Sequence, residues 1–369
     1  MNRWIVVGLI LATATIGAQK PAAPLAVNGG DNLMYIGTYA GTIQIFDEAT
    51  EAKIGDIKLQ TGIPRSLTLS QSRSKFYVLD STLEKIEIVD IPSRASLSTF
   101  TLSEGNKKVR IRGMQVDPLE RFLILLTRSA TKQIDRWEIG DISMQFYDLA
   151  EKKVTRSIPW PRGEEREFVN IRFSPDGKLL YFFGDDVLIL ETANFTEVDT
   201  WALSRPIEPG LGRVNFGSVD DVNEDPGFFT GLFTTQDSIQ NRRIMSLGRV
   251  NLVAKTIDLT PIGPAEGIGF AMAPDRKRAW GLMQGNGGAQ PIGRYEFWAF
   301  DVAQKKLLSR TPFDGRPRMA LRVSSNGKLI YVYQAGATID VYDSASYKRL
   351  RTIEMNADQT TTLYILPRK

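Results

Sequence analysis

Residues 174–190, which read SPDGKLLYFFGDDVLIL, hold the pattern that decides the fold. The turn sequence SPDGK at residues 174–178 is followed at once by an apolar run at residues 179–183. Proline presets φ for a turn and the Asp-Gly pair supplies tight hairpin geometry, so the segment predicts a hairpin. The next apolar run ends in Leu190 and Glu191. We expect the side-chain oxygen at this last position to cap the following turn.

The same unit recurs along the chain. Related turns stand at residues 117–121, 273–277 and 324–328, and degraded copies stand at residues 70–74 and 223–226. An apolar second strand is expected at residues 33–36, 76–79, 122–126, 179–183, 228–232, 279–283 and 329–333. These strands start about every 50 residues, a period typical of propeller blades.

The two ends of the chain stand at different phases of this unit. The repeats begin with a second strand at residues 33–36, and residues 362–366 form one further apolar strand after the last unit. Pairing this last strand with the first completes a blade and removes exposed sheet edges. The sequence therefore predicts an all-β protein. We expect residues 32–369 to form one seven-bladed β-propeller of four-stranded antiparallel blades, closed by pairing the C-terminal inner strand with the three N-terminal strands.

The N-terminus has the features of a secretory signal peptide. Arg3 supplies a positive charge, residues 5–16 carry none, and Gly17 and Ala18 are small residues before a cleavage point. The apolar stretch is shorter than the roughly 20 residues that a membrane span needs. We expect a cleaved signal at residues 1–18, a flexible lead-in at residues 19–31, and a periplasmic or secreted protein with no transmembrane span after cleavage.

Composition narrows the chemistry. The chain has no cysteine and no histidine. This excludes disulfides, thiolate metal sites, thioether-linked haem and an imidazole base on this chain. We therefore expect no covalent cofactor here. The 46 basic and 42 acidic residues are interspersed, which does not suit nucleic-acid binding.

The mouth of the central channel is the expected binding site, because inner strands begin there and loops converge. Aligning the inner strands on their turns places eight polar residues at this mouth: Arg65, Arg112, Glu167, Asn170, Arg213, Asn215, Glu266 and Arg318. Such a ring suits an anionic ligand or a carboxylate-bearing partner. The alternative is a solvated channel whose charges satisfy one another.

The third blade carries an insertion at residues 128–141 that contains Trp137. A long insertion on a regular scaffold is a candidate partner surface, although Trp137 could equally pack within its own loop. The acidic pairs of the chain lack the spacing of a calcium loop, so no metal site is expected. No catalytic residue is identified.

The chain resembles the YVTN-type bacterial propellers, most clearly at residues 174–190. It is most similar to the propeller (beta) subunit of quinohaemoprotein amine dehydrogenase, which is akin to the methylamine dehydrogenase heavy chain. The resemblance rests on the ending at residues 340–353 with its threonine-rich closing segment at residues 358–362, the third-blade insertion before residues 145–148, the turn at residues 273–277, and the order of long and short blades.

In that family the propeller carries no covalent cofactor and packs against a dihaem subunit and a small quinone-bearing subunit in the periplasm. The resemblance implies the same partners here, with haem or quinone only on those partners, and transfers no catalytic residue. The leading hypothesis is an exported binding or scaffolding propeller, the cofactor-free subunit of an amine-dehydrogenase-like complex. A lactonase-like hydrolase using the central channel and a surface adhesion or stress-related propeller are the alternatives.

Overall fold

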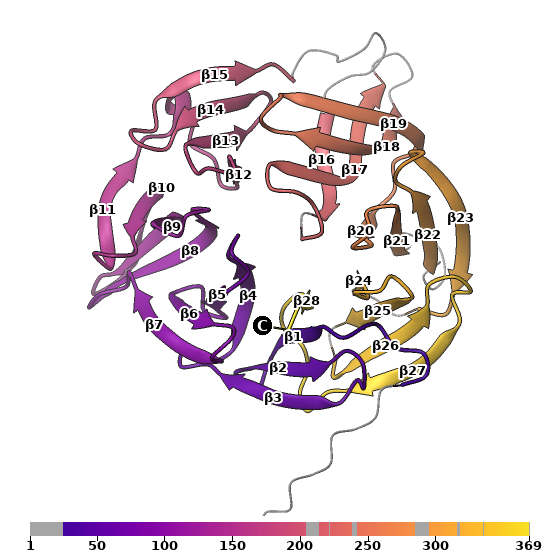
Figure 1. Ribbon diagram of the computed structural model, residues 1–369. Helices are drawn as coiled ribbons and strands as arrows, with labels where there is room; N and C mark the ends of the chain where they lie inside the picture. Colours follow the sequence, from indigo (N-terminus) through magenta and orange to yellow (C-terminus); the bar gives the residue numbers. More distant parts are fainter. Residues whose placement is uncertain are drawn as a thin grey trace, which may run out of the picture.

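Seven four-stranded antiparallel sheets stand in a ring around a central axis in the computed structural model of the chain (Figure 1). The structure describes residues 25–203, 214–220, 222–237, 242–284, 295–315, 318–334 and 336–368. The expected signal at residues 1–18 and the candidate site residue Arg213 lie outside these ranges. The chain is a seven-bladed β-propeller, as its repeat predicts.

Each sheet has one strand nearest the axis and three that follow outward. The inner strands are β28 (Tyr364–Leu366), β4 (Pro64–Leu69), β8 (Lys107–Val116), β12 (Asn170–Phe173), β16 (Val214–Asp220), β20 (Ile268–Met272) and β24 (Met319–Val323). The second strands are β1 (Leu33–Thr38), β5 (Lys75–Asp80), β9 (Phe122–Lys132), β13 (Leu179–Phe183), β17 (Phe228–Asp237), β21 (Arg278–Gln284) and β25 (Leu329–Gln334). The third strands are β2 (Thr42–Asp47), β6 (Lys85–Asp90), β10 (Trp137–Asp148), β14 (Val187–Glu191), β18 (Arg242–Asn251), β22 (Tyr295–Asp301) and β26 (Thr338–Asp343). The outer strands are β3 (Lys53–Lys58), β7 (Ala95–Thr101), β11 (Lys153–Ile158), β15 (Glu197–Trp201), β19 (Thr256–Pro264), β23 (Lys306–Phe313) and β27 (Arg349–Glu354). One 3-10 turn, η1 (Pro161–Gly163), precedes β12.

The hydrophobic core is divided among the interfaces between neighbouring blades. Strand β5 shows why, because successive side chains of a strand point to opposite faces of its sheet. Phe76 and Val78 pack against the first blade, whereas Tyr77 and Leu79 pack against the third. All four side chains are buried. Second strands are therefore apolar on both faces, which explains the continuous apolar runs in the sequence.

The acid or amide that ends a third strand caps the next turn in six blades, as expected from the sequence. In the fourth blade the prediction was wrong: the Glu191 side chain makes no such bond in the described structure, and the N–H of Thr196 donates to the Asn194 side chain at 2.9 Å instead. The carboxylate of Asp47 accepts hydrogen bonds from the backbone N–H groups of Ala49 and Thr50, at 2.9 and 3.0 Å. Side chains that make the same kind of bond are those of Asp90, Asp148, Asn251, Asp301 and Asp343. These positions are structural.

The ring closes where the phase of the repeat predicts. Strand β28 pairs antiparallel with β1, and the pairing places Leu366 opposite Leu33 and Tyr364 opposite Tyr35. The hydroxyl of Tyr364 also donates to the carbonyl of Leu67 in the second blade, at 3.0 Å. The last strand is therefore the inner strand of the first blade, as Figure 1 shows.

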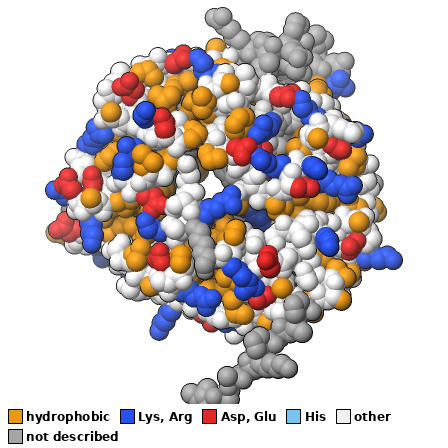
Figure 2. All heavy atoms as spheres, in the orientation of Figure 1, with side chains coloured by type: hydrophobic (Ala, Val, Ile, Leu, Met, Phe, Trp, Pro, Cys, Tyr) orange, Lys and Arg blue, Asp and Glu red, His pale blue; other side chains and the backbone are white. Residues whose placement is uncertain are grey.

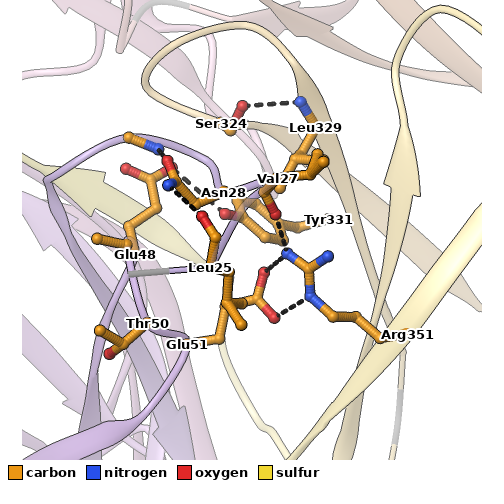
Figure 3. Close-up of polar contacts among 12 residues, drawn as sticks. Leu25, Val27, Asn28, Glu48, Thr50, Glu51, Ser324, Leu329, Tyr331 and Arg351 are labelled. Carbon is orange, nitrogen blue, oxygen red and sulfur yellow. Dashed lines mark hydrogen bonds and ion pairs between the residues drawn. The ribbon is translucent and has the colours of Figure 1, made fainter. Parts of the chain in front are cut away.

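The segment before β1 forms a second seam between the first and last blades (Figure 3). Arg351 donates to the carbonyl of Val27 at 2.7 Å and makes a two-bond ion pair with Glu51 at 2.5 and 2.6 Å. Fully buried Glu48 accepts from the N–H and the hydroxyl of Ser325 at 2.9 and 2.6 Å. Burial raises the pKa of the Glu48 carboxyl. The expected flexible lead-in is thus fixed over residues 25–31 by contacts with the last blade.

Candidate functional site

The third blade is longer than its neighbours. Strands β8, β9 and β10 have 10, 11 and 12 residues, whereas β4, β5 and β6 of the second blade have six each. The insertion expected as a loop at residues 128–141 is largely a continuation of β9 and β10. Its strands extend the sheet, with Trp137 opposite Lys132 and Ile139 opposite Ala130.

A cavity of about 1060 Å³ lies against this extension and is called the β8–β10 cleft below. Residues from both the second and the third blade line it, together with Phe168 from the segment before β12. Its basic lining residues are Arg65, Lys108, Arg110, Arg112 and Arg128. Its one acidic lining residue is Glu84.

Strand geometry gathers these cations on one side. Along β8, Val109 and Ile111 are buried on one face, so Lys108 and Arg110 point to the other. A shift in register between Ile111 and Gly113 makes Arg112 an extra, unpaired residue of β8. Such bulges re-aim side chains beside functional sites. Arg65 occupies the same kind of position in β4, where the register shifts between Pro64 and Ser66.

Two arginines face each other directly. Arg110 of β8 pairs in register with Arg128 of β9. Residues opposite each other on one face have Cβ atoms about 5 Å apart, and like charges there destabilise the sheet. Glu167 compensates part of the charge of Arg128, and a further negative charge beside Arg110 would lower the remaining repulsion.

The acids near the cleft leave part of its charge uncompensated. Glu84 pairs with Lys108 at 3.4 Å, and Glu167 pairs with Arg128 at 3.5 Å. Within the described part of the chain, Arg65, Arg110 and Arg112 pair with no carboxylate. The guanidinium of Arg112 lies 5.2 Å from the ring centre of Phe168. Three exposed guanidinium groups therefore line one cavity without a paired carboxylate in the described structure.

The cleft also has an apolar side. Trp137, Ile139 and Phe168 line it and are 51%, 58% and 72% exposed. Trp137 and Ile139 are two residues apart on β10, so they project from the same face of the sheet. The Trp137 side chain therefore points into the cleft and does not pack within its own loop.

The structure unites some of the expected site residues and separates others. Arg65, Arg112 and Trp137 line the β8–β10 cleft, and Glu167 reaches its rim through Arg128. The other described candidates are exposed at the starts of inner strands outside the cleft: Asn170, Asn215, Glu266 and Arg318.

Sequence reasoning missed Lys108, Arg110, Arg128 and Phe168 as lining residues. The alternation of residues 108–112, which read KVRIR, was a usable signal. It places basic side chains on one face of a strand and apolar side chains on the other.

At the other end of the inner strands, turns from different blades contact across the ring. The Gln71 side chain donates to the carbonyl of Pro175 at 3.3 Å, and Arg73 donates to the carbonyl of Val222. These contacts join turns of different blades across the channel at this end. In Figure 2 basic and acidic side chains are interspersed over the rim, and basic side chains gather beside the central opening.

The described residues hold neither a metal-binding cluster nor a membrane-spanning helix. They contain no group of three or more Asp, Glu, His or Cys side chains placed to hold a metal ion. They also contain no helix of the length and apolar character that crossing a membrane requires.

Solved structures with the same fold exist. Dihydro-heme d1 dehydrogenase NirN in complex with DHE matches with a TM-score of 0.53 and 12% identity, covering 96% of this chain and 79% of that chain. A functionally unknown protein from Desulfotomaculum acetoxidans matches with a TM-score of 0.54 and 12% identity, covering 92% and 100%. Apo AztD from Citrobacter koseri matches with a TM-score of 0.51 and 13% identity, covering 91% and 99%.

At these identities the likeness establishes the fold alone. No protein-family model matches the chain, and no curated protein matches it. The resemblance to the amine dehydrogenase propeller subunit therefore stays a prediction from the sequence.

Proposed function

We propose that this chain is an exported binding propeller whose β8–β10 cleft holds an anionic ligand. The observation that carries the proposal is the set of three guanidinium groups, those of Arg65, Arg110 and Arg112, that face one cavity without a carboxylate partner in the described structure. Guanidinium groups bind carboxylate and phosphate oxygens through two parallel hydrogen bonds, which gives both strength and orientation.

The Arg110–Arg128 register pair supports the same interpretation. A structural role would be served as well by a neutral or opposite-charge pair at these two positions. A ligand anion removes the repulsion and adds charge-assisted hydrogen bonds. The electrostatic repulsion between the two arginines in the free protein is then offset when the anion binds.

Titration calorimetry with citrate, a small trivalent anion, tests the proposal. The triple variant R65Q/R110Q/R112Q should lose at least tenfold in affinity. A matched variant, K277Q/K306Q/K348Q, removes the same charge from exposed lysines outside the cleft and should bind as the parent does. Equal losses in the two variants would show that only net charge matters, which contradicts a built site.

Export is part of the proposal and rests on residues 1–18. Amino-terminal sequencing of the protein recovered from intact cells should find a start near Gln19. An uncleaved chain in the cytoplasmic fraction would contradict it.

A second candidate function is the cofactor-free subunit of an amine-dehydrogenase-like complex with dihaem and small quinone-bearing partners. An uncovered sheet edge favours it. Strand β11 pairs with β10 only over Met144–Asp148, so residues 137–141 have no outer strand in the described structure. The long β18 of the fifth blade, in contrast, is covered by β19 from Ile244 to Asn251. Exposed edges are sites where partner chains add.

Affinity purification of the tagged chain from its native cells tests this candidate. The complex predicts haem absorbance in the purified material and amine-dependent reduction of an added electron acceptor. A monomer without haem absorbance would contradict it. That result would leave the anion site unaffected.

A further inference from the structure

The face of the third blade that lines the cleft changes in character from the inner strand outward. One row across the sheet places Lys108 on β8, Ala130 on β9 and Ile139 on β10 opposite one another. All three line the cleft. Crossing the face outward thus leads from a cation through a small residue to an exposed aliphatic side chain.

The rows on either side differ from this one. Toward the ring the face carries Arg110 opposite Arg128, with Arg112 beyond them at the bulge. Toward the hairpin tip it carries Trp137 opposite Lys132, with Trp137 on the same side of β10 as Ile139. Of this last pair, only Trp137 lines the cleft. Neighbouring strands lie about 4.8 Å apart and residues rise about 3.3 Å along a strand. The unpaired arginines and Trp137 are therefore on the order of 15 Å apart across one continuous surface.

The apolar end is built for contact as well as the charged end. Single exposed apolar side chains are common on protein surfaces and need no explanation. Here Trp137 and Ile139 line the same cavity as the arginines, so they form an apolar surface beside the charged one. Phe168 adds an exposed ring at the charged end, where the Arg112 guanidinium lies 5.2 Å from its ring centre. A purely hydrophilic anion would leave these side chains in water, whereas an apolar chain would cover them.

We infer that the ligand of the β8–β10 cleft is an amphiphilic anion, with an acidic head held by Arg110 and Arg112 and an apolar tail lying over Ala130 toward Ile139 and Trp137. This inference rests on the proposed anion-binding function and names its ligand class. The head is a carboxylate, sulfate or phosphate, since guanidinium groups take all three. The tail is an alkyl chain or ring system long enough to reach from Arg110 to Trp137 across this face of the third blade.

Calorimetric titration of dodecanoate and butyrate, below the micelle concentration and on delipidated full-length mature protein, tests the inference. A fully buried methylene raises affinity about fourfold, and a half-buried one about twofold. Dodecanoate, with eight more methylenes than butyrate, should therefore bind at least tenfold more tightly. Equal affinities would overturn the inference.

Variants locate the tail. Trp137→Ala should weaken dodecanoate at least threefold and leave citrate binding unchanged, because citrate has no tail. Val253→Ala removes an equally exposed apolar side chain far along the chain, which does not line the cleft, and should change neither. Ile139→Ser provides a second tail variant, and an unchanged thermal midpoint confirms that each variant is folded. Dodecanoate binding that survives Trp137→Ala, Ile139→Ser and Arg110→Gln would place it elsewhere and overturn the inference.

The citrate titration separates the two levels of the argument. If citrate binds and dodecanoate binds no more tightly than butyrate, the ligand is not an amphiphile, but the cleft still binds anions. If neither citrate nor dodecanoate binds, the proposed function falls. A hexaglutamate peptide that binds more tightly than dodecanoate would indicate that the cleft binds an acidic protein segment. That result would overturn the inference of an amphiphilic ligand.

Discussion

Replacing Arg110 with glutamine should make the protein more stable and a weaker binder at the same time. The variant removes one charge of the directly opposed Arg110–Arg128 pair. Relief of a like-charge cross-strand contact is worth about 0.2–1 kcal/mol, and two charges near 4 Å in water repel by about 1 kcal/mol. We expect the free energy of unfolding to rise by about 0.5 kcal/mol.

The affinity change has the opposite sign. A hydrogen bond to a charged group contributes about 1.5–3 kcal/mol, and the exposure of this cleft favours the lower end. The variant should therefore bind citrate about tenfold more weakly, since 1.4 kcal/mol corresponds to a factor of ten.

Urea unfolding and citrate calorimetry measure the two effects on one preparation. Arg136→Gln is the control, because Arg136 is exposed on the same hairpin, pairs with Asp135 and Glu138, and does not line the cleft. It should give neither a gain in stability nor a loss of affinity. The stability gain of Arg110→Gln should also shrink in 1 M salt, where charges are screened beyond about 3 Å. A variant that is less stable than the parent would show that Arg110 and Arg128 do not repel each other, and unchanged citrate binding would show that Arg110 does not hold the anion.

Two further predictions concern the closure of the ring. Leu366→Ala truncates a buried side chain of the closing strand, so it should lower the free energy of unfolding, measured in urea, by about 2–5 kcal/mol. The control Leu350→Ala, on the exposed outer strand, should change this free energy by no more than about 0.5 kcal/mol. Equal effects of the two variants would contradict the closure. Glu48→Gln tests the buried seam. Burial raises the pKa of Glu48 above its ordinary value of 4.5. The protonated carboxyl therefore stabilises the fold at low pH, and this contribution is lost as pH rises through the folded pKa. The stability of the variant relative to the parent should accordingly increase as pH rises above 4.5. A difference that does not change with pH would contradict it.

The architecture could be predicted from the sequence because propeller blades carry local signals. The turn at residues 174–178 and its copies mark where second strands begin, and the structure places those strands at the expected positions. Closure by residues 364–366 followed from the phase of the repeat. The capping role of Asp47 and its equivalents followed from side-chain chemistry alone.

The candidate site was predicted only in part, because it depends on register. Alignment on the turns placed Arg65 and Arg112 at the starts of inner strands, but the bulges that turn both into the same cavity are tertiary features. The opposition of Arg110 and Arg128 requires β8 and β9 to continue past the usual blade length. Because residues 128–141 are predicted to be a loop, the sequence offers no strand register from which this opposition could be inferred. Phe168 reaches the cleft from the next blade, a contact that no local pattern encodes.

The central claim is that the unpaired arginines of the third-blade cleft hold an anion. Anomalous diffraction from crystals containing selenate, at a concentration that saturates binding in solution, tests it most directly. We expect a selenium peak in the cleft, placed so that the selenate oxygens accept hydrogen bonds from the Arg110 and Arg112 guanidinium groups. A cleft without a peak in crystals that bind selenate elsewhere would contradict it.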